Sequence, residues 1–339
     1  MKTRRVITAV DSHNCAETTR FIMSGFPRIR GKTMWEKTKY CQEHFDHLRK
    51  AVALHPRGFK EILGAILTEP CNPEADAGIV YYHAGGFWEA CGDSTFSSCK
   101  VLLEFGIVEK QEPVTEIKLD TAGGLLRCSA EIKDGVVGYI SYEAVPSFYQ
   151  ESTVLDVEEF GKLHADISYG GLWYAIVDSE EAGLVVDPKN ADRLIKAGMA
   201  VVDAANKRVK VVHPLNPDLN KITIMEFSSK PTLPKNNYKH CNVFGVGSLC
   251  VSPAGTSVSA KLAAKVAKGE LGLGQEIIVE SPVNPELVMK GKAVRKVKVG
   301  KFDGIIPGLS ARPFITGINR WVIEEGDPIG HGFHIGRYE

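Results

Sequence analysis

Two short segments of the chain place glycine beside thiol or hydroxyl residues at the start of a helix-like stretch. Residues 90–94 read A-C-G-D-S, and the apolar stretch after them stops at Gly106, a typical signal for a helix C-terminus. Residues 253–257 read P-A-G-T-S, and their stretch stops at Gly269. In both copies, 15 positions separate the second residue of the segment from the closing glycine. This equal spacing indicates a weak internal repeat.

A helix start of this kind can bind a carboxylate and activate a thiol. The first backbone N–H groups of a helix have no partner within it, and the helix dipole adds partial positive charge. We therefore expect the backbone near Gly92 and Gly255 to bind a substrate carboxylate at close range. The same dipole lowers the pKa of a thiol, which makes Cys91 a candidate base near neutral pH. The alternative is an ordinary helix start, since Ser and Thr are common capping residues.

Strands dominate the elements that the sequence predicts around these two segments. Runs of β-branched and aromatic residues predict strands over residues 5–10, 78–84, 116–120, 135–142, 208–213, 221–227, 241–246, 276–280 and 320–323. A capping-box pattern at Thr33 and Glu36 predicts a helix that continues to Val52, and another helix is expected over residues 190–206. Each glycine segment follows a predicted strand, so each half of the chain contains a strand-loop-helix unit.

Composition argues against several classes of function. The 339 residues include 41 Lys and Arg and 41 Asp and Glu, so there is no net charge to attract nucleic acid. No apolar run approaches the ~18 residues of a membrane span, and the apolar stretch 6–10 is too short for a signal peptide. The eight cysteines are scattered without zinc-site spacing. We expect a cytoplasmic α/β protein with no metal and no nucleic-acid or membrane partner.

The residues in and around both segments resemble the motifs of the proline racemase family. This family includes proline racemases, hydroxyproline epimerases and trans-3-hydroxyproline dehydratases. The first segment resembles the family's M-C-G-H motif, and residues 250–256 (C-V-S-P-A-G-T) resemble its D-R-S-P-C-G-T motif. The order and spacing of the motifs agree from end to end. Further matches occur at residues 11–13 with 17–20, at 55–58, at 169–171 with Tyr174, and at 314–317.

The resemblance implies both a fold and a division of roles. The fold would consist of two pseudo-symmetric α/β halves, each a curled β-sheet around a central helix as in diaminopimelate epimerase, with the active site between them. We expect the first half to comprise residues 1–125 and 310–339 and to carry Cys91, and the second to comprise residues 126–309. No cofactor, pyridoxal phosphate included, is implied. The implied partner is a small amino-acid substrate, bound by a monomer or homodimer.

The sequence departs from the family pattern at the second catalytic cysteine. In the racemases, two cysteines face opposite sides of Cα, one removing the proton and the other returning it. Cys91 matches the first of them, but Ala254 stands in place of the second, and alanine cannot carry a proton. Cys250, four positions earlier, replaces an Asp of the motif. It is either an alternative base or a packed thiol.

Other departures concern the substrate amine and the pocket. Asp93 replaces the His of the first motif, so it could pair with a substrate ammonium or simply cap the helix. Leu172 stands where the family loop often has Asn, which suggests a less polar substrate edge. His13, Cys15 and Cys99 are expected to be structural. The expected substrate-binding residues are Gly92, Asp93, Ser94, Cys250, Ala254, Gly255 and Thr256.

Three functions are compatible with this pattern. The first is a one-base dehydratase, in which Cys91 removes the α-proton and a β-substituent leaves; the family's trans-3-hydroxy-L-proline dehydratases also keep the first cysteine and lose the second. The second is a proline racemase or hydroxyproline 2-epimerase, with Cys250 as the other base or with Ala254 as an introduced substitution. The third is a non-catalytic amino-acid-binding homologue. We expect the first, with the exact substrate left open.

Overall fold

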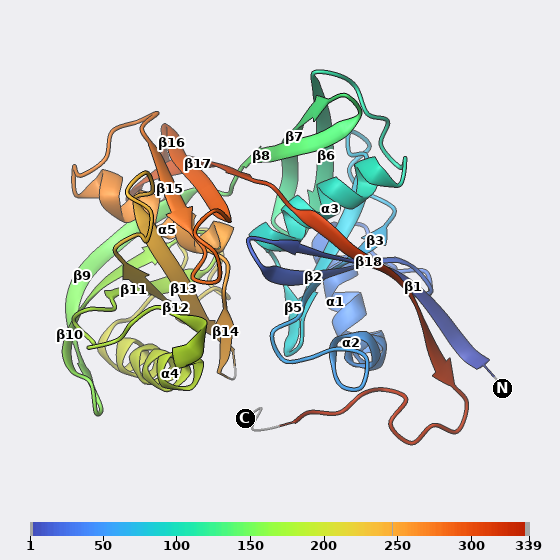
Figure 1. Cartoon of the computed structure of the whole chain (residues 1–339), viewed down its shortest axis with the longest axis horizontal. Coiled ribbons are helices and arrows are strands. Elements are labelled where there is room, and N and C mark those ends of the chain that lie inside the picture. The colour runs from blue at the N-terminus through green and yellow to red at the C-terminus, as the bar shows by residue number, and fades with distance from the viewer. Residues whose placement is uncertain (1–2, 246, 336–339) are drawn as a thin grey trace. The chain divides into compact units, whose positions relative to one another are not determined.

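The computed structural model describes residues 3–245 and 247–335, which form two compact units (Figure 1). Within this described part, unit 1 comprises residues 3–142 and 312–335, and unit 2 comprises residues 143–311. The boundary expected after residue 125 falls inside the strand β7 (Gly124–Lys133), which pairs along its length with β6 (Val114–Thr121). This pairing keeps β7 in unit 1, so the first boundary lies later in the chain than expected.

Unit 1 is built from strands of one mixed sheet and from helices packed against it. Its other strands are β1 (Thr3–Asn14), β2 (Glu17–Ser24), β3 (Leu63–Thr68), β4 (Ala77–His83), β5 (Gly86–Trp88), β8 (Val136–Glu143) and β18 (Phe314–Glu324). Its helices are α1 (Met34–His44), α2 (Asp46–Ala53) and α3 (Gly92–Glu104).

Unit 2 repeats this plan. Its strands are β9 (Ser147–Val157), β10 (Gly161–Tyr169), β11 (Trp173–Asp178), β12 (Ile224–Ser229), β13 (Tyr238–Phe244), β14 (Ser248–Cys250), β15 (Glu276–Glu280), β16 (Val288–Val299) and β17 (Phe302–Ala311). Its helices are α4 (Ala191–Arg208), which follows a short 3₁₀ turn at Pro188–Asn190, and α5 (Gly255–Ala267).

The strand pairings show that the internal repeat extends through both units. In unit 1, β2 is parallel to β3, β4 is antiparallel to β3 and β5, and β4 is parallel to β6. In unit 2, β11 is parallel to β12, β13 is antiparallel to β12 and β14, and β13 is parallel to β15. The helices α3 and α5 occupy the same place in this order, and each has 13 residues. The repeat seen at two short segments therefore belongs to the whole chain.

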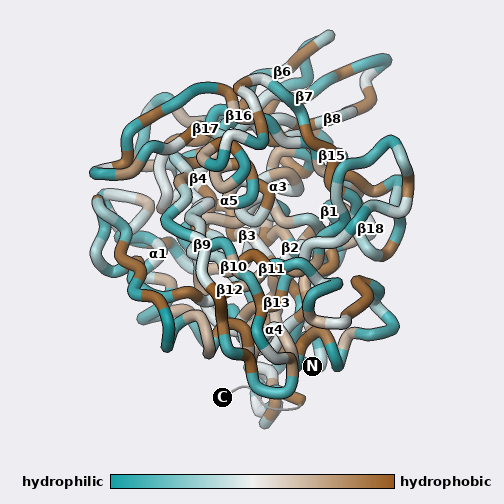
Figure 2. Tube along the Cα trace, turned by 90° about the vertical axis from the view of Figure 1, so that its left-hand side faces the viewer, coloured by the Kyte–Doolittle hydropathy of each residue, from teal (hydrophilic) through white to brown (hydrophobic). Residues whose placement is uncertain are grey.

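Each unit encloses one central helix. All residues from Gly92 to Cys99 of α3 are buried, and α3 contacts β1, β2, β3 and β18. In the same way α5 contacts β9, β10, β11, β16 and β17. A helix buried on nearly all sides belongs in a core, so each sheet curls around its helix as the resemblance implied. Figure 2 shows brown, white and teal stretches mixed along the labelled strands, and in β6 the burial of successive residues alternates over the first half of the strand.

Most of the expected elements are present, and two expectations were wrong. The helix expected up to Val52 is divided at Phe45, which ends α1 and precedes α2 while its ring packs against Tyr40. The strand expected over residues 208–213 is absent: Val209 and Val211 are buried alternately as in a strand, but residues 209–213 pair with no described strand. None of the described helices combines the length and apolarity needed to cross a bilayer.

Candidate functional site

Cys91 lies at the start of α3, where the sequence placed it. It precedes Gly92, the first helical residue, with extended backbone angles of φ −150° and ψ 110°. Its carbonyl accepts a hydrogen bond from the backbone N–H of Thr95 at 3.0 Å, and its thiol donates to the hydroxyl of Ser94 at 3.2 Å. The residue is 6% exposed. The thiol is therefore buried against the first turn of the helix.

The pKa of Cys91 is raised, to about 12, and not lowered as the helix start predicted. Burial is the largest cause, because it disfavours the charged thiolate, and the negative charges of Asp93 and Glu17 act in the same direction. The hydroxyl and backbone N–H of Ser94 lower the pKa without offsetting these effects. The thiol is thus protonated near neutral pH. A positive charge placed beside the two carboxylates would favour the thiolate.

The turn between β1 and β2 brings polar side chains to the same helix start. The side-chain amide of Asn14 donates a hydrogen bond to Oδ1 of Asp93 at 2.7 Å, and both residues are buried. Cys15 and Ala16 form the turn with positive φ angles of 48° and 76°, a conformation that costs residues with a Cβ about 1 kcal/mol. Glu17, the first residue of β2, is 2% exposed. Unit 1 thus places two buried carboxylates near the thiol.

Ala254 occupies the matching position before α5, with a different backbone. Its φ of 56° lies in the left-handed region, whereas that of Cys91 is extended. Its N–H donates to the hydroxyl of Ser252 at 2.9 Å, and its carbonyl accepts from the N–H of Val258 at 2.9 Å. The methyl side chain supplies neither an acid nor a base. The polar groups at this helix start are backbone N–H groups and the hydroxyls of Ser252, Thr256 and Ser257.

Cys250 is the last residue of β14 and lies outside the helix start. Its sulfur lies 3.5 Å from the hydroxyl of Ser252, the same hydroxyl that accepts from the N–H of Ala254. Cys250 is 4% exposed. One serine therefore connects the thiol to the position of the missing cysteine. Its two expected roles, second base and packed thiol, both stay predictions.

The end of β10, the start of β11 and the loop between them pack on the first turns of α5. The hydroxyl of Tyr174 lies 2.7 Å from that of Thr256, and the hydroxyl of Ser168 donates to the carbonyl of Ala260 at 2.8 Å. A Cβ on Gly170 would lie 2.1 Å from the carbonyl oxygen of Thr256, so only glycine fits there. These contacts fix the start of α5 against β10 and β11.

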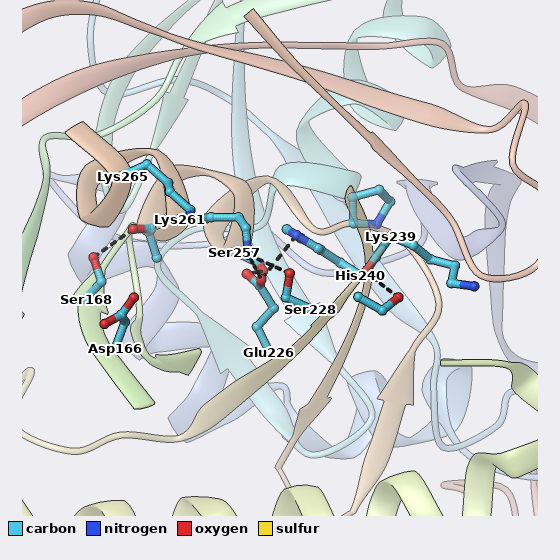
Figure 3. A network of polar contacts seen from close by, with 12 residues as sticks. Asp166, Ser168, Glu226, Ser228, Lys239, His240, Ser257, Lys261 and Lys265 are labelled. Carbon is cyan, nitrogen blue, oxygen red and sulfur yellow. Dashed lines mark hydrogen bonds and ion pairs between the residues drawn. The ribbon is translucent and has the colours of Figure 1, made fainter. Parts of the chain in front are cut away.

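A buried polar network also anchors α5 to the sheet (Figure 3). Glu226 on β12 is fully buried and accepts hydrogen bonds from the hydroxyl of Ser257 at 2.5 Å and from Nζ of Lys261 at 2.8 Å. Lys261 also donates to the hydroxyl of Ser228 at 2.7 Å. Nε2 of His240 lies 3.1 Å from the Glu226 carboxylate, and the pKa of His240 is lowered by burial and by Lys261. The imidazole of His240 is therefore neutral, and the charged groups of the network are the ammonium of Lys261 and the carboxylate of Glu226.

Two other residues considered from the sequence have structural roles. Nδ1 of His13 accepts a hydrogen bond from the N–H of Ala16 at 3.3 Å, and its ring stacks on Phe314 with centroids 5.3 Å apart. Cys99 is fully buried within α3. His13 therefore supports the turn between β1 and β2.

Two cavities lie apart from both helix starts. One has a volume of about 760 Å³ and lies in unit 1, the other has about 420 Å³ and lies in unit 2, and neither is lined by Cys91 or Ala254. Among the residues that the structure describes, no three His, Cys, Asp or Glu side chains are grouped so that they could hold a metal ion. The candidate site therefore consists of thiol, carboxylate, hydroxyl and backbone groups.

Sequence reasoning missed several polar residues that the fold brings to the helix starts. Asn14 is 79 positions from Asp93, so no local pattern connects them. Glu17 lies within the segment 17–20 that matched a family motif, and that match was a signal that could have marked it. Glu226 stands in the apolar strand sequence I-M-E-F, where a lone carboxylate indicates a buried partner.

Known proteins resemble this chain over nearly its whole length. The family model described as "Proline racemase" matches residues 9–334. The proline racemase of Clostridioides difficile is 37% identical over 98% of this chain and 99% of its own, and the trans-3-hydroxy-L-proline dehydratase of Burkholderia ambifaria is 31% identical over the same shares. The crystal structure of a hydroxyproline epimerase from Agrobacterium vitis with bound trans-4-hydroxy-L-proline aligns with a TM-score of 0.91, at 29% identity, over 99% of this chain and 96% of the other.

Proposed function

The chain belongs to the proline racemase family, and on that premise we propose that it is a cofactor-independent dehydratase that removes the α-proton of a β-hydroxylated, proline-like amino acid with Cys91. Relatives include a racemase, an epimerase and a dehydratase, so family membership does not choose among these activities. The observation that carries the proposal is the difference between the two helix starts. One holds a thiol, Cys91, and the other holds the methyl group of Ala254.

A single thiol suffices when the proton and the leaving hydroxyl lie on one face of the ring. In trans-3-hydroxy-L-proline, the hydroxyl is opposite the carboxylate and hence on the same face as the α-proton. The thiolate of Cys91 takes this proton as the Cα–H bond breaks. The electron pair forms the Cα–Cβ double bond as the Cβ–O bond breaks, and the proton leaves with the hydroxide as water. The thiolate is then regenerated, and the enamine product tautomerises to an imine.

The substrate ammonium would activate the thiol. We assign its binding to Asp93, which is held by Asn14, with Glu17 as a second buried carboxylate nearby. Both carboxylates raise the pKa of Cys91, so an ammonium that neutralises them would lower that pKa again. Deprotonation of the base would then be coupled to binding of an amino acid.

The substrate carboxylate would be bound by helix starts, because negative charge develops there as the α-proton leaves. We assign this role to the first turns of α3 and α5. The residues of this assignment are Gly92 and Ser94 on α3, and Ala254, Gly255 and Thr256 on α5, with Cys250 behind Ser252 as a further substrate-binding residue.

Racemase or epimerase activity is the second candidate, supported by one contact. Cys250 touches Ser252, whose hydroxyl accepts from the N–H of Ala254. A proton could pass from the thiol of Cys250 through this hydroxyl toward the face that Cys91 does not serve. In that case the chain would exchange the α-proton of both enantiomers.

Proton NMR in heavy water distinguishes these functions. The chain is incubated with each enantiomer of proline and of the 3- and 4-hydroxyprolines, and the Cα proton, optical rotation and imine product are followed. We expect an imine product from a 3-hydroxyproline and no racemisation of any isomer. Cys91→Ala should abolish turnover. The control variant Cys99→Ala, which removes a thiol from the same helix, should keep it. Ala254→Cys should create racemase activity. Rapid racemisation with Ala254 in place would overturn the one-base mechanism and favour Cys250.

A further inference from the structure

The larger cavity lies at the end of the unit 1 sheet that is remote from the candidate active site. It is formed at the carboxyl ends of the parallel strands β2 and β3 and is bordered by the segment 25–32, which leads into α1. Crevices at the carboxyl ends of parallel strands commonly bind ligands. Ser24 at the end of β2 lines the cavity, whereas Glu17 begins the same strand, about 23 Å away at 3.3 Å per residue. The cavity is therefore separate from the assigned active site.

Three cations follow one another along one wall of this cavity. Arg28, Arg30 and Lys32 are exposed, while Ile29 between the first two is 7% exposed and belongs to the core. This alternation is typical of an extended segment with one face toward solvent. Within residues 3–245 and 247–335, no carboxylate lies within ion-pair distance of these three side chains. Their charges are available to a ligand.

A fourth cation in the cavity is buried beside neutral groups. Lys37 on α1 is 5% exposed, and its ammonium donates hydrogen bonds to the backbone carbonyl of Glu69 and to the hydroxyl of Thr68. A buried ammonium is costly unless an opposite charge compensates it. The described lining of the cavity contains one carboxylate, the exposed side chain of Glu69, against four cations. The carboxylates of Glu36 and Asp120 lie beside the lining, where they accept hydrogen bonds from backbone N–H groups and form no ion pair with these cations. The lining thus carries an excess of positive charge.

The cavity in unit 2 provides a contrast within the same chain. It is also lined by four lysines, but each ammonium lies within 3.0 Å of a carboxylate oxygen. The pairs are Lys230 with Glu180, Lys261 with Glu226, Lys265 with Glu270, and Lys268 with Asp166. The charges of the lysines that line the unit 2 cavity are therefore balanced by ion pairs with carboxylates, whereas the described cations of the unit 1 cavity form no such ion pairs.

We propose that the unit 1 cavity binds an organic polyanion, a molecule that carries two or more carboxylate or phosphate groups. In an extended segment, residues two positions apart have Cα atoms roughly 6–7 Å apart on the same face, and each arginine can bind one oxyanion in a bidentate manner. Lys37 supplies a cation at the buried end. Phe26 and Leu67, which are half-buried in the lining, contact the carbon skeleton of the ligand.

Isothermal titration of the full chain with citrate and with inorganic pyrophosphate tests this site, at near-physiological salt so that loose surface attraction is screened. We expect one of them to bind with one molecule per chain, citrate if the site is built for carboxylates and pyrophosphate if it is built for phosphates. The double variant Arg28→Gln with Arg30→Gln should bind at least about tenfold more weakly, because each lost bidentate contact is a charge-assisted pair. Lys37→Met should have a similar effect.

The matched control is Lys39→Gln, which removes an exposed cation of the same helix that lies over the ring of Trp35 and not in the cavity. Its affinity should change less than about twofold, since a remote exposed charge is screened. Cys91→Ala should bind as the wild type does. Because both arginines are exposed, their double variant keeps the test decisive even if Lys37→Met fails to fold. Binding of neither anion to the wild type, or equal binding by the double arginine variant, would overturn the proposal.

Discussion

The protonation state of Cys91 is set by residues that the sequence alone did not connect. Its helix start argues for a low thiol pKa, yet the buried carboxylates of Asp93 and Glu17 and the burial itself raise that pKa to about 12. Deprotonation at neutral pH therefore requires a change in this local charge. The balance between the helix dipole and the two carboxylates can be measured without knowing the substrate.

Alkylation of Cys91 by iodoacetamide, followed by mass spectrometry of its peptide, measures this balance. Since only the thiolate reacts, the rate should rise about tenfold per pH unit from about pH 7 to about pH 10 without reaching a plateau. Asp93→Asn should increase the rate severalfold at fixed pH, because it removes a negative charge that raises the pKa. Asp203→Asn, at an exposed position of α4, should leave the rate unchanged. A plateau near pH 8 would show that the helix start dominates after all.

At the scale of elements, a buried carboxylate on β12 is one of the groups that hold the start of α5. Ser257, the third residue of α5, donates to Glu226 on β12. Ser259, two residues later and equally buried, donates instead to the carbonyl of Gly255 within its own helix. The two serines therefore differ in whether they tie the helix to the sheet.

Ser257→Ala should destabilise the protein by about 1.5–3 kcal/mol, the range for hydrogen bonds to charged groups, whereas Ser259→Ala should cost about 1 kcal/mol or less. Amide hydrogen exchange should show faster exchange in the first turn of α5 for the first variant only. Ser257→Thr, which keeps the hydroxyl, should restore protection. Equal exchange in the two alanine variants would mean that the contacts of Gly170 and Tyr174 suffice to hold α5.

The elements themselves were largely predictable, because their signals are local. The capping pattern at Thr33, the glycine after α3 and the alternation in β6 each act within a few residues. The division at Phe45 was not predictable, since the helical spacing of apolar residues continues across it. The contact of Asp93 with Asn14 was not predictable either, because Asn14 lies 79 positions away in the chain. Spacing therefore located Cys91 but could not describe its surroundings.

At the scale of the whole molecule, the two units share a plan but differ in their buried charge. In unit 2, the third residue of β12 is Glu226, the third residue of β13 is His240 and the seventh residue of α5 is Lys261. The same positions of β3, β4 and α3 are occupied by Ala65, Ile79 and Ser98. Unit 2 thus contains an ion pair and a histidine where unit 1 has small or apolar side chains. A buried ion pair seldom adds net stability, whereas removal of one partner leaves an uncompensated buried charge and is strongly destabilising.

The neutral His240 should make the stability of the protein depend on pH. Its pKa in the folded chain is lowered by burial and by Lys261, so below about pH 6.5 the unfolded chain takes up a proton that the folded chain does not. Stability therefore falls as the pH falls, by up to about 1.4 kcal/mol per pH unit for this one group. Urea unfolding between about pH 7 and about pH 5 should show this slope.

In His240→Asn, the free energy of unfolding should depend less steeply on pH, by the contribution of one proton. This change in slope is expected whatever the variant does to stability at neutral pH. His164→Asn is the control, because this exposed histidine contacts the carboxylate of Glu181 at the surface. An unchanged slope in His240→Asn would mean that His240 is protonated in the folded chain and pairs with Glu226 as a cation.

One thiol of the chain differs from the rest in a way that has practical consequences. Seven of the eight cysteines are buried, whereas Cys71 is partly exposed and lines the cavity of unit 1. At neutral pH, where the buried thiol of Cys91 is protonated, a maleimide dye should therefore react first with Cys71, and its emission would report in real time whether the cavity is occupied. The same accessibility makes Cys71 the point at which stored protein would become covalently linked into pairs, so purification should be carried out under reducing conditions.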